Sequence, residues 1–277
     1  MGFFEAIWKS IVLGTVQGLT EFLPVSSSGH LTLLQRVLGY NIGEGGMMFV
    51  NVLLHFGTLV AVIAAFWRDI LALFKKPFKT LLMLIVATIP AGVVGVLFND
   101  KIEAIFNPDT NPAWLCWLAV FFATTAMILL ITEIVSKNRK KERALGWGNS
   151  VAMGVVQAAA LFPGISRSGS TIAAGVISGA KKEEVAKFSF LMSIPVILGS
   201  VAVELWHVVR PAEGVSFALS APEIVGMAVG VVFAAVSGFF AIKVMLKVIG
   251  KGNYKWFSFY LVILSLTCFW INVLGIL

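Results

Sequence analysis

The sequence predicts an all-α polytopic membrane protein with six transmembrane helices, two re-entrant helix-turn-helix hairpins and inverted-topology repeats. Of its 277 residues, 58% are hydrophobic and only 13% are charged, whereas soluble domains carry about 25% charged residues. Several apolar runs are long enough to cross a bilayer. Two related polar segments interrupt this apolar chain. These observations exclude a soluble globular protein.

Six apolar runs approach the roughly 20 residues that a helix needs to cross the hydrocarbon core. We expect transmembrane helices at residues 47–66, 80–98, 113–133, 188–208, 223–246 and 256–276. The net charge of +7 comes from basic residues in the short loops between these runs. It therefore indicates membrane orientation rather than a nucleic-acid partner.

The loop charges predict how the chain is threaded. Loops 68–79, 137–143 and 247–255 carry +3, +4 and +3, whereas loops 100–109 and 209–223 carry −2 and −1. The positive loops are expected in the cytoplasm. Because the loop after residue 180 is also basic, the segment 144–187 should enter and leave on one side, with its turn at 163–170. The same argument predicts a hairpin of opposite sense within residues 1–45, with its turn at 23–29.

The two hairpins are related in sequence. GTVQGLTEFLPVSSSG at 14–29 and GVVQAAALFPGISRSG at 154–169 share seven identical positions at a constant offset. Such repeats with broken helices are typical of proteins that bind a ligand where the repeats meet. We therefore predict a single membrane domain, residues 1–277, with repeats at about 1–133 and 144–277 and with the two turns face to face. Close helix packing by small residues is the alternative explanation of the shared pattern.

The predicted turns concentrate hydrogen-bond donors at membrane depth. Each precedes a half-helix, at 28–39 and 170–179, whose first N–H groups are unpaired and whose dipole is positive at that end. The Arg167 guanidinium adds a forked donor that matches phosphate oxygens, although it could instead pair with Glu21. The expected phosphate-binding hydroxyls belong to Ser26, Ser27, Ser166, Ser168 and Thr171. This donor set favours an anion, above all phosphate.

Ser27 and His30 share one helical face and are candidates for the chemistry. Ser27 could attack phosphorus while His30 takes its proton, with Glu21 orienting His30 or holding a divalent cation. Alternatively, His30 itself is the nucleophile. We expect Gln17 and its repeat counterpart Gln157 to line the cavity and orient these groups.

Two further histidines receive no role from the sequence. His55 and His207 have no polar partners at helical spacing, so they are interpreted as structural.

The segments QGLTEFLPVSSSGH at 17–30 and PGISRSGST at 163–171 resemble the two signatures of the undecaprenyl-diphosphate phosphatase family, also called bacitracin-resistance proteins. These signatures are an (E/Q)xxxE element followed by a His, and PGxSRSxxT. A weaker match, FSFLMSIP at 188–195, follows in the expected order. The resemblance covers essentially the whole chain.

The resemblance implies hydrolysis of undecaprenyl diphosphate to undecaprenyl phosphate and inorganic phosphate in a bacterial inner membrane, which recycles a carrier lipid for peptidoglycan synthesis. It also implies an active site facing the periplasm, a divalent cation (Mg²⁺ or Ca²⁺) and bacitracin resistance, since bacitracin binds the same substrate. By motif position the catalytic and phosphate-binding residues are Glu21, Ser27, His30, Ser166, Arg167 and Thr171. Gln17 takes the first acidic position, which weakens a metal site built from this element alone.

Two other functions compete with this interpretation. Inverted repeats with broken helices are also typical of transporters and flippases, but binding alone needs no nucleophile. A second class of membrane lipid phosphatases uses SGH and SR elements like those at 28–30 and 166–167, but the KxxxxxxRP element is absent here. The sequence leaves the oligomeric state open, a homodimer included.

Overall fold

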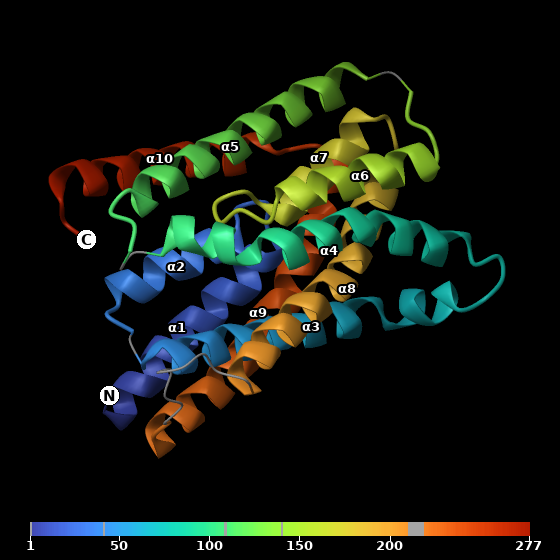
Figure 1. Cartoon of the computed structure of the whole chain (residues 1–277). Coiled ribbons are helices and arrows are strands. Elements are labelled where there is room, and N and C mark those ends of the chain that lie inside the picture. The colour runs from blue at the N-terminus through green and yellow to red at the C-terminus, as the bar shows by residue number, and fades with distance from the viewer. Residues whose placement is uncertain (1, 41, 108–109, 140, 210–218) are drawn as a thin grey trace.

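The computed structural model describes residues 2–40, 42–107, 110–139, 141–209 and 219–277, without the side chains at 44, 45, 99, 100, 103, 204, 207 and 208. These residues form ten α-helices and no strand (Figure 1). The helices are α1 (Phe3–Phe22), α2 (Ser27–Val37), α3 (Glu44–Leu73), α4 (Lys79–Phe106), α5 (Trp114–Asn138), α6 (Trp147–Ala159), α7 (Arg167–Ile177), α8 (Lys182–Val209), α9 (Ala221–Lys251) and α10 (Lys255–Leu274). Parts of the loops counted for orientation, and the His207 side chain, lie outside the described residues.

The six predicted transmembrane helices are confirmed. Among the described residues, six helices are long and apolar enough to cross a membrane, and they lie in α3, α4, α5, α8, α9 and α10. Large apolar side chains such as Val96, Met127 and Phe259 are exposed on their outer faces. A bilayer would cover these side chains. The chain is therefore a multi-pass membrane protein.

The four helices outside this set form two helix-turn-helix pairs, α1 with α2 and α6 with α7, and the members of each pair pack together. The turns are shorter than expected. We predicted half-helices at 28–39 and 170–179, but α2 begins at Ser27 and α7 begins at Arg167. Ser26 and Ser166 take the N-cap positions, and the residues that follow them are already helical, although only Ser166 caps its helix with its side chain.

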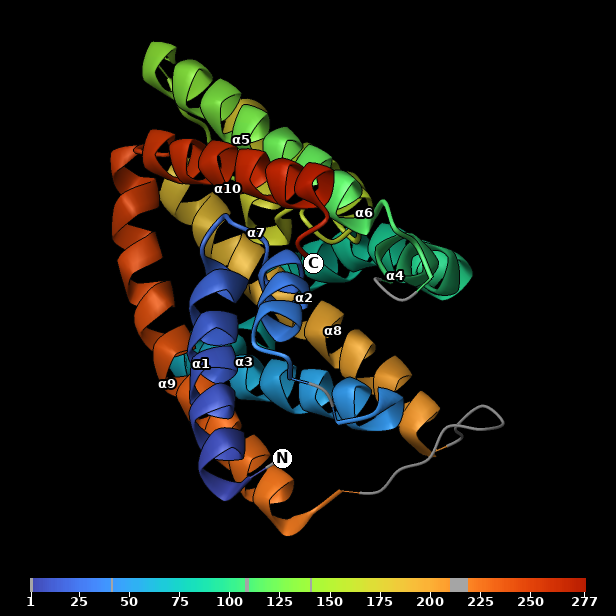
Figure 2. The same ribbon diagram turned by 90° about the vertical axis from the view of Figure 1, so that its left-hand side faces the viewer.

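Each pair packs on a long helix from the other half of the chain. Helix α1 lies along α9, and α6 lies along α4. Helices α5 and α10 lie side by side in both views (Figure 2). If α1–α5 are exchanged in order with α6–α10, the contact of α1 with α9 becomes that of α6 with α4. The contact of α5 with α10 becomes itself. The packing is thus compatible with two repeats.

Glycines set the closest of these approaches. A Cβ atom on Gly14 would lie 2.1 Å from the Gly230 oxygen on α9, and one on Gly154 would lie 2.5 Å from the Ala87 oxygen on α4. Gly14 and Gly154 occupy matching places in the two related segments. Any larger residue at either position would push a helix pair away from its partner.

Candidate active site

The first turn contains a strained serine. Ser26 has φ of 70°, and it is the only non-glycine with positive φ among the described residues. This left-handed conformation is costly for a residue with a Cβ atom, and it persists only where surrounding contacts enforce it. One such contact is the Gly164 N–H, which donates to Ser26 Oγ at 3.0 Å. The second turn therefore holds the first in place.

The second turn is fixed by its own cap and by α5. Ser166 Oγ accepts from the Gly169 N–H at 3.1 Å and so caps α7. Thr125 Oγ1 donates to the Gly164 carbonyl at 2.9 Å and accepts from the Ser166 N–H at 3.1 Å. Gly164 has φ of 94°, and a Cβ atom there would lie 2.8 Å from the Phe121 side chain. Only glycine fits this position.

The two turns touch each other. A Cβ atom on Gly29 would lie 3.0 Å from the Gly164 nitrogen, and one on Gly169 would lie 3.1 Å from Pro24. Ser168 Oγ also donates to the Leu23 carbonyl at 2.9 Å. The starts of α2 and α7 are thereby brought together inside the protein.

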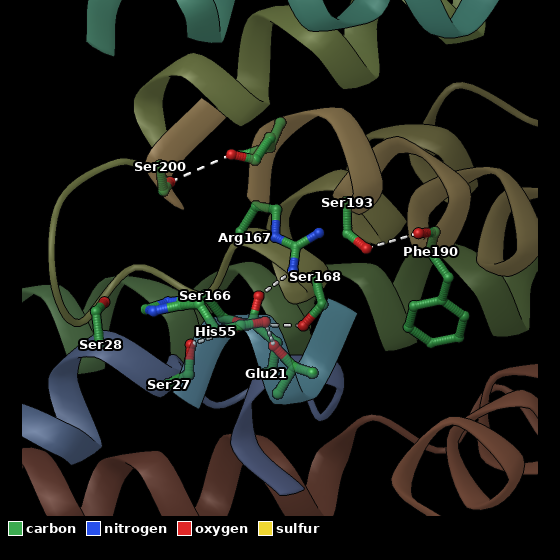
Figure 3. A network of polar contacts seen from close by, with 12 residues as sticks. Glu21, Ser27, Ser28, His55, Ser166, Arg167, Ser168, Phe190, Ser193 and Ser200 are labelled. Atoms are coloured by element: carbon green, nitrogen blue, oxygen red, sulfur yellow. Dashed lines mark hydrogen bonds and ion pairs between the residues drawn. The ribbon is translucent and has the colours of Figure 1, made fainter. Parts of the chain in front are cut away.

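The Glu21 carboxylate joins the turns chemically (Figure 3). Arg167 Nη2 donates to Glu21 Oε1 at 2.5 Å, and Ser27 Oγ donates to Glu21 Oε2 at 2.5 Å. Gln17 Nε2 donates to the same Oε2 at 3.2 Å. Only 6% of the Glu21 side chain and 13% of the Arg167 side chain are exposed. This buried cluster contains an acid, a hydroxyl that donates to it and a guanidinium.

Several polar atoms around this cluster have no partner. Within the described part of the chain, Arg167 Nη1 and Gln17 Oε1 are buried without a hydrogen bond, a state that costs about 1–3 kcal/mol or more per group. Helix α2 has no side-chain cap, so N–H groups of its first turn are free to bind a ligand. A cavity of about 50 Å³ lies here, lined by Thr20, Glu21, Ser26, Ser27, Ser28, Ala160, Ile165, Ser166 and Arg167. It offers donors to a small anion.

Comparison with known proteins shows which family this chain matches. The model of the family described as bacitracin resistance protein BacA matches residues 10–267. The chain belongs to this family. An undecaprenyl-diphosphatase of Carboxydothermus hydrogenoformans is 39% identical over 97% of this chain and 98% of its own. An undecaprenyl-diphosphatase of Halothermothrix orenii is 39% identical over 92% of this chain and 93% of its own. One of Methanosphaera stadtmanae is 32% identical over 94% of this chain and 96% of its own.

His30 does not make the hydrogen bond to Ser27 that the expected catalytic pair requires. In this member of the BacA family His30 Nδ1 donates to the Ser26 carbonyl at 2.7 Å, which leaves Nε2 of a neutral ring to accept from the Tyr260 hydroxyl at 2.7 Å. No hydrogen bond joins His30 to Ser27 or Glu21 in the described part of the chain. The proton of Ser27 points to Glu21 instead. Tyr260 carries no recognisable signal in the sequence, because it lies in the last apolar span.

Some residues expected at the site do not line its cavity, among them Thr171, Gln157 and Ser168. Thr171 is fully buried, and its hydroxyl lies 2.9 Å from the Arg167 carbonyl and 2.7 Å from Ser189 Oγ on α8. Gln157 is also fully buried, and neither polar atom of its amide has a hydrogen-bond partner among the residues that the structure describes. Neither residue lines the cavity. Thr171 instead anchors the helix that carries Arg167.

His55 is a site residue that the sequence analysis missed. Its Nδ1 donates to the Asn51 carbonyl at 2.8 Å, one turn back on α3. It interacts electrostatically with Glu21, and Figure 3 shows its ring beside the Ser27 and Glu21 side chains. This proximity arises from packing between α1 and α3. A histidine within an apolar run carries no local signal of such a contact.

Proposed function

We propose that this chain is an undecaprenyl-diphosphatase, which hydrolyses undecaprenyl diphosphate to undecaprenyl phosphate and inorganic phosphate. The observation that carries the proposal is the buried cluster of Glu21, Ser27 and Arg167 drawn from both turns. Relatives that span almost the whole chain bear this activity as their name. Phosphoryl transfer needs mainly a positioned nucleophile and neutralisation of the phosphate oxygens, and this cluster supplies both.

In the proposed reaction Ser27 is the nucleophile. Its hydroxyl donates to Glu21 at 2.5 Å, so Glu21 is placed to take the proton. The Ser27 oxygen bonds to the terminal phosphorus as the bridging P–O bond breaks, and undecaprenyl phosphate leaves. Water then attacks the phosphoserine, the Ser27 oxygen leaves phosphorus and takes back the proton from Glu21, and inorganic phosphate is released with the protons of the water. His30 as nucleophile is less well supported, because both its ring nitrogens are engaged.

Arg167 would bind the transferred phosphate. Its Nη2 is held by Glu21, whereas its buried Nη1 has no partner and can donate to a phosphate oxygen. The free N–H groups at the start of α2 add donors and the positive end of a helix dipole. Such donors act most strongly where water is excluded. Ser26, Ser28 and Ser166 line the same cavity and complete the donor set.

A divalent cation, Mg²⁺ or Ca²⁺, fits the donor set in part. Among the described residues no group of three His, Cys, Asp or Glu side chains could hold a metal ion. The buried and unpartnered Gln17 Oε1 beside the Glu21 carboxylate nevertheless offers oxygen ligands. Mg²⁺ commonly takes its remaining ligands from water and substrate phosphates. When bound, the cation would neutralise charge on the diphosphate oxygens.

The setting follows from the same proposal. We place the protein in a bacterial inner membrane, with two inverted repeats and an active site that opens to the periplasm. The lipid substrate would stay in the bilayer while its headgroup enters the cavity. Consumption of the lipid diphosphate that bacitracin binds would account for the resistance named in the family's description.

Reconstituted vesicles test this proposal against the transporter alternative. Purified protein is incubated with undecaprenyl diphosphate on one side of the bilayer, and free phosphate and intact lipid on the other side are both measured. The proposal predicts free phosphate. Intact substrate that crosses the bilayer without phosphate release would instead indicate a carrier.

A further inference from the structure

A long apolar groove runs along α4 and α8. One part of it, a cavity of about 500 Å³, is lined by residues of α3, α4 and α8 and by Phe74, and Thr88 is the only one of its lining residues with a polar side chain. Leu84 and Ile194 are among its aliphatic walls. The Thr88 hydroxyl donates to the Leu84 carbonyl of its own helix at 2.8 Å. The cavity therefore presents hydrocarbon to whatever fills it.

A second cavity continues this groove. It has a volume of about 180 Å³ and shares Thr88, Gly92 and Pro195 with the first. Ser200 adds a second hydroxyl, which donates to the Val196 carbonyl one turn back at 3.2 Å (Figure 3). Both hydroxyls are thus satisfied within their helices. The two cavities therefore adjoin along one apolar groove.

The groove ends beside the candidate active site. Leu161 lines the second cavity, and the preceding residue, Ala160, lines the small polar cavity that contains Glu21 and Arg167. A Cβ atom on Gly95 would lie 4.0 Å from Leu161 Cδ1, so α4 is in contact with this turn. The second turn therefore separates a phosphate-sized polar cavity from an apolar one.

We propose that this groove binds the isoprenoid tail of the substrate, an inference that rests on the proposed function. A polyprenyl diphosphate has a polar head joined to a long hydrocarbon chain, and this pair of adjoining cavities matches that order. Burial of isoprenoid carbons between α4 and α8 adds affinity in proportion to the buried apolar area. The groove gives the enzyme a preference for long prenyl chains over short ones with the same headgroup.

Two glycines allow the groove to be filled without disturbing the helices. Gly92 on α4 and Gly199 on α8 line the groove, and a Cβ atom on either meets no atom within 4 Å. We therefore expect Gly92→Phe and Gly199→Phe to fold and to occupy the space of the tail. Gly148→Phe on α6 is the matched control, because it is equally open and lies outside both cavities.

Hydrolysis of undecaprenyl diphosphate and of farnesyl diphosphate is measured for each variant. We expect KM for the long substrate to rise about tenfold in both groove variants, which corresponds to the loss of about two buried methylenes. We expect a smaller rise in KM for farnesyl diphosphate, because its short chain reaches only the part of the groove beside the active site, and we expect kcat and the Gly148→Phe control to be unchanged. An unchanged KM for the long substrate, or an equal loss with both substrates, would overturn the proposal. If the wild type hydrolysed neither substrate, the proposed function itself would be refuted.

A labelling experiment needs no variant. A prenyl diphosphate with a photoreactive group in its tail is irradiated with wild-type protein, with and without excess undecaprenyl diphosphate. We expect labelled peptides from 81–96 and 191–203, and loss of the label with competitor. Label found only on other peptides, or label that competitor does not reduce, would overturn the proposal.

Discussion

Arg167 Nη2 donates to Glu21 Oε1 at 2.5 Å, although the two residues are 146 positions apart and lie on α7 and α1. The pair joins the two turns at the point where Ser27 also donates to Glu21. Loss of one member of a buried ion pair leaves an unpaired charge and costs about 3–5 kcal/mol. The same contact thus holds the turns together and places an acid beside a hydroxyl.

Arg167→Lys tests whether the two fixed N–H groups of the guanidinium are needed, rather than its charge alone. Lysine keeps the charge but cannot bind Glu21 and a phosphate with two fixed N–H groups. We expect phosphate release to fall about 10²-fold, comparable to the loss of one oxyanion donor. Initial rates in detergent measure the effect, and thermal unfolding checks that the variant folds. A folded lysine variant with the wild-type rate would mean that charge alone suffices.

Chemical trapping identifies the nucleophile. Substrate radiolabelled in its terminal phosphate is mixed with enzyme and quenched in acid. We expect an acid-stable label on the peptide that contains Ser27, because Ser27 already shares its proton with Glu21. The label should disappear in Ser27→Ala. An acid-labile label that is lost in His30→Gln would point to phosphohistidine instead.

The conformation of Ser26 predicts a difference between two small substitutions. Ser26→Gly and Ser26→Ala both remove the hydroxyl that accepts from Gly164, but only glycine adopts a φ of 70° without strain. We expect the alanine variant to be less stable than the glycine variant by about 1–2 kcal/mol. Denaturation midpoints in one detergent provide the comparison. Equal midpoints would show that the turn relaxes.

His55→Gln tests the residue that the sequence did not reveal. His55 interacts electrostatically with the Glu21 carboxylate, which is placed to take the Ser27 proton. We therefore expect the variant to lower kcat, with little change in KM or thermal stability. A loss of stability without a loss of kcat in the folded fraction would assign His55 to structure alone.

Removal of divalent cations tests the metal proposal. We expect a chelator to abolish phosphate release and Mg²⁺ or Ca²⁺ to restore it. Gln17→Glu adds a carboxylate beside Glu21 and should lower the Mg²⁺ concentration needed for half-maximal rate, since affinity follows the number of charged ligands. Full activity after exhaustive chelation would rule out the cation.

Length and hydropathy predicted the six transmembrane helices, because the bilayer sets a minimum apolar length that is visible in any sequence. The pairing of Glu21 with Arg167 was anticipated as an alternative, since a buried guanidinium needs an anionic partner. The starts of α2 and α7 were misplaced because each helix begins directly after Ser26 or Ser166, and only at Ser166 does a side-chain cap account for the early start.

Contacts between distant helices could not be predicted in this way. Tyr260 reaches His30 across 230 positions, and His55 approaches Glu21 only because α1 packs against α3. Thr171 belongs to the second motif, yet its hydroxyl meets Ser189 on α8. Motif spacing shows which residues lie together on one helix, but not which helix they face.

A double-mutant cycle of Glu21→Gln and Arg167→Gln measures most directly whether the two turns form one active site. Phosphate release from undecaprenyl diphosphate is determined for the wild type, both single variants and the double variant, each checked for folding. We predict that either single change lowers the rate about 10²–10³-fold and that the double variant is no slower than the worse single variant. Wild-type turnover in either single variant, or losses that multiply in the double variant, would contradict this account.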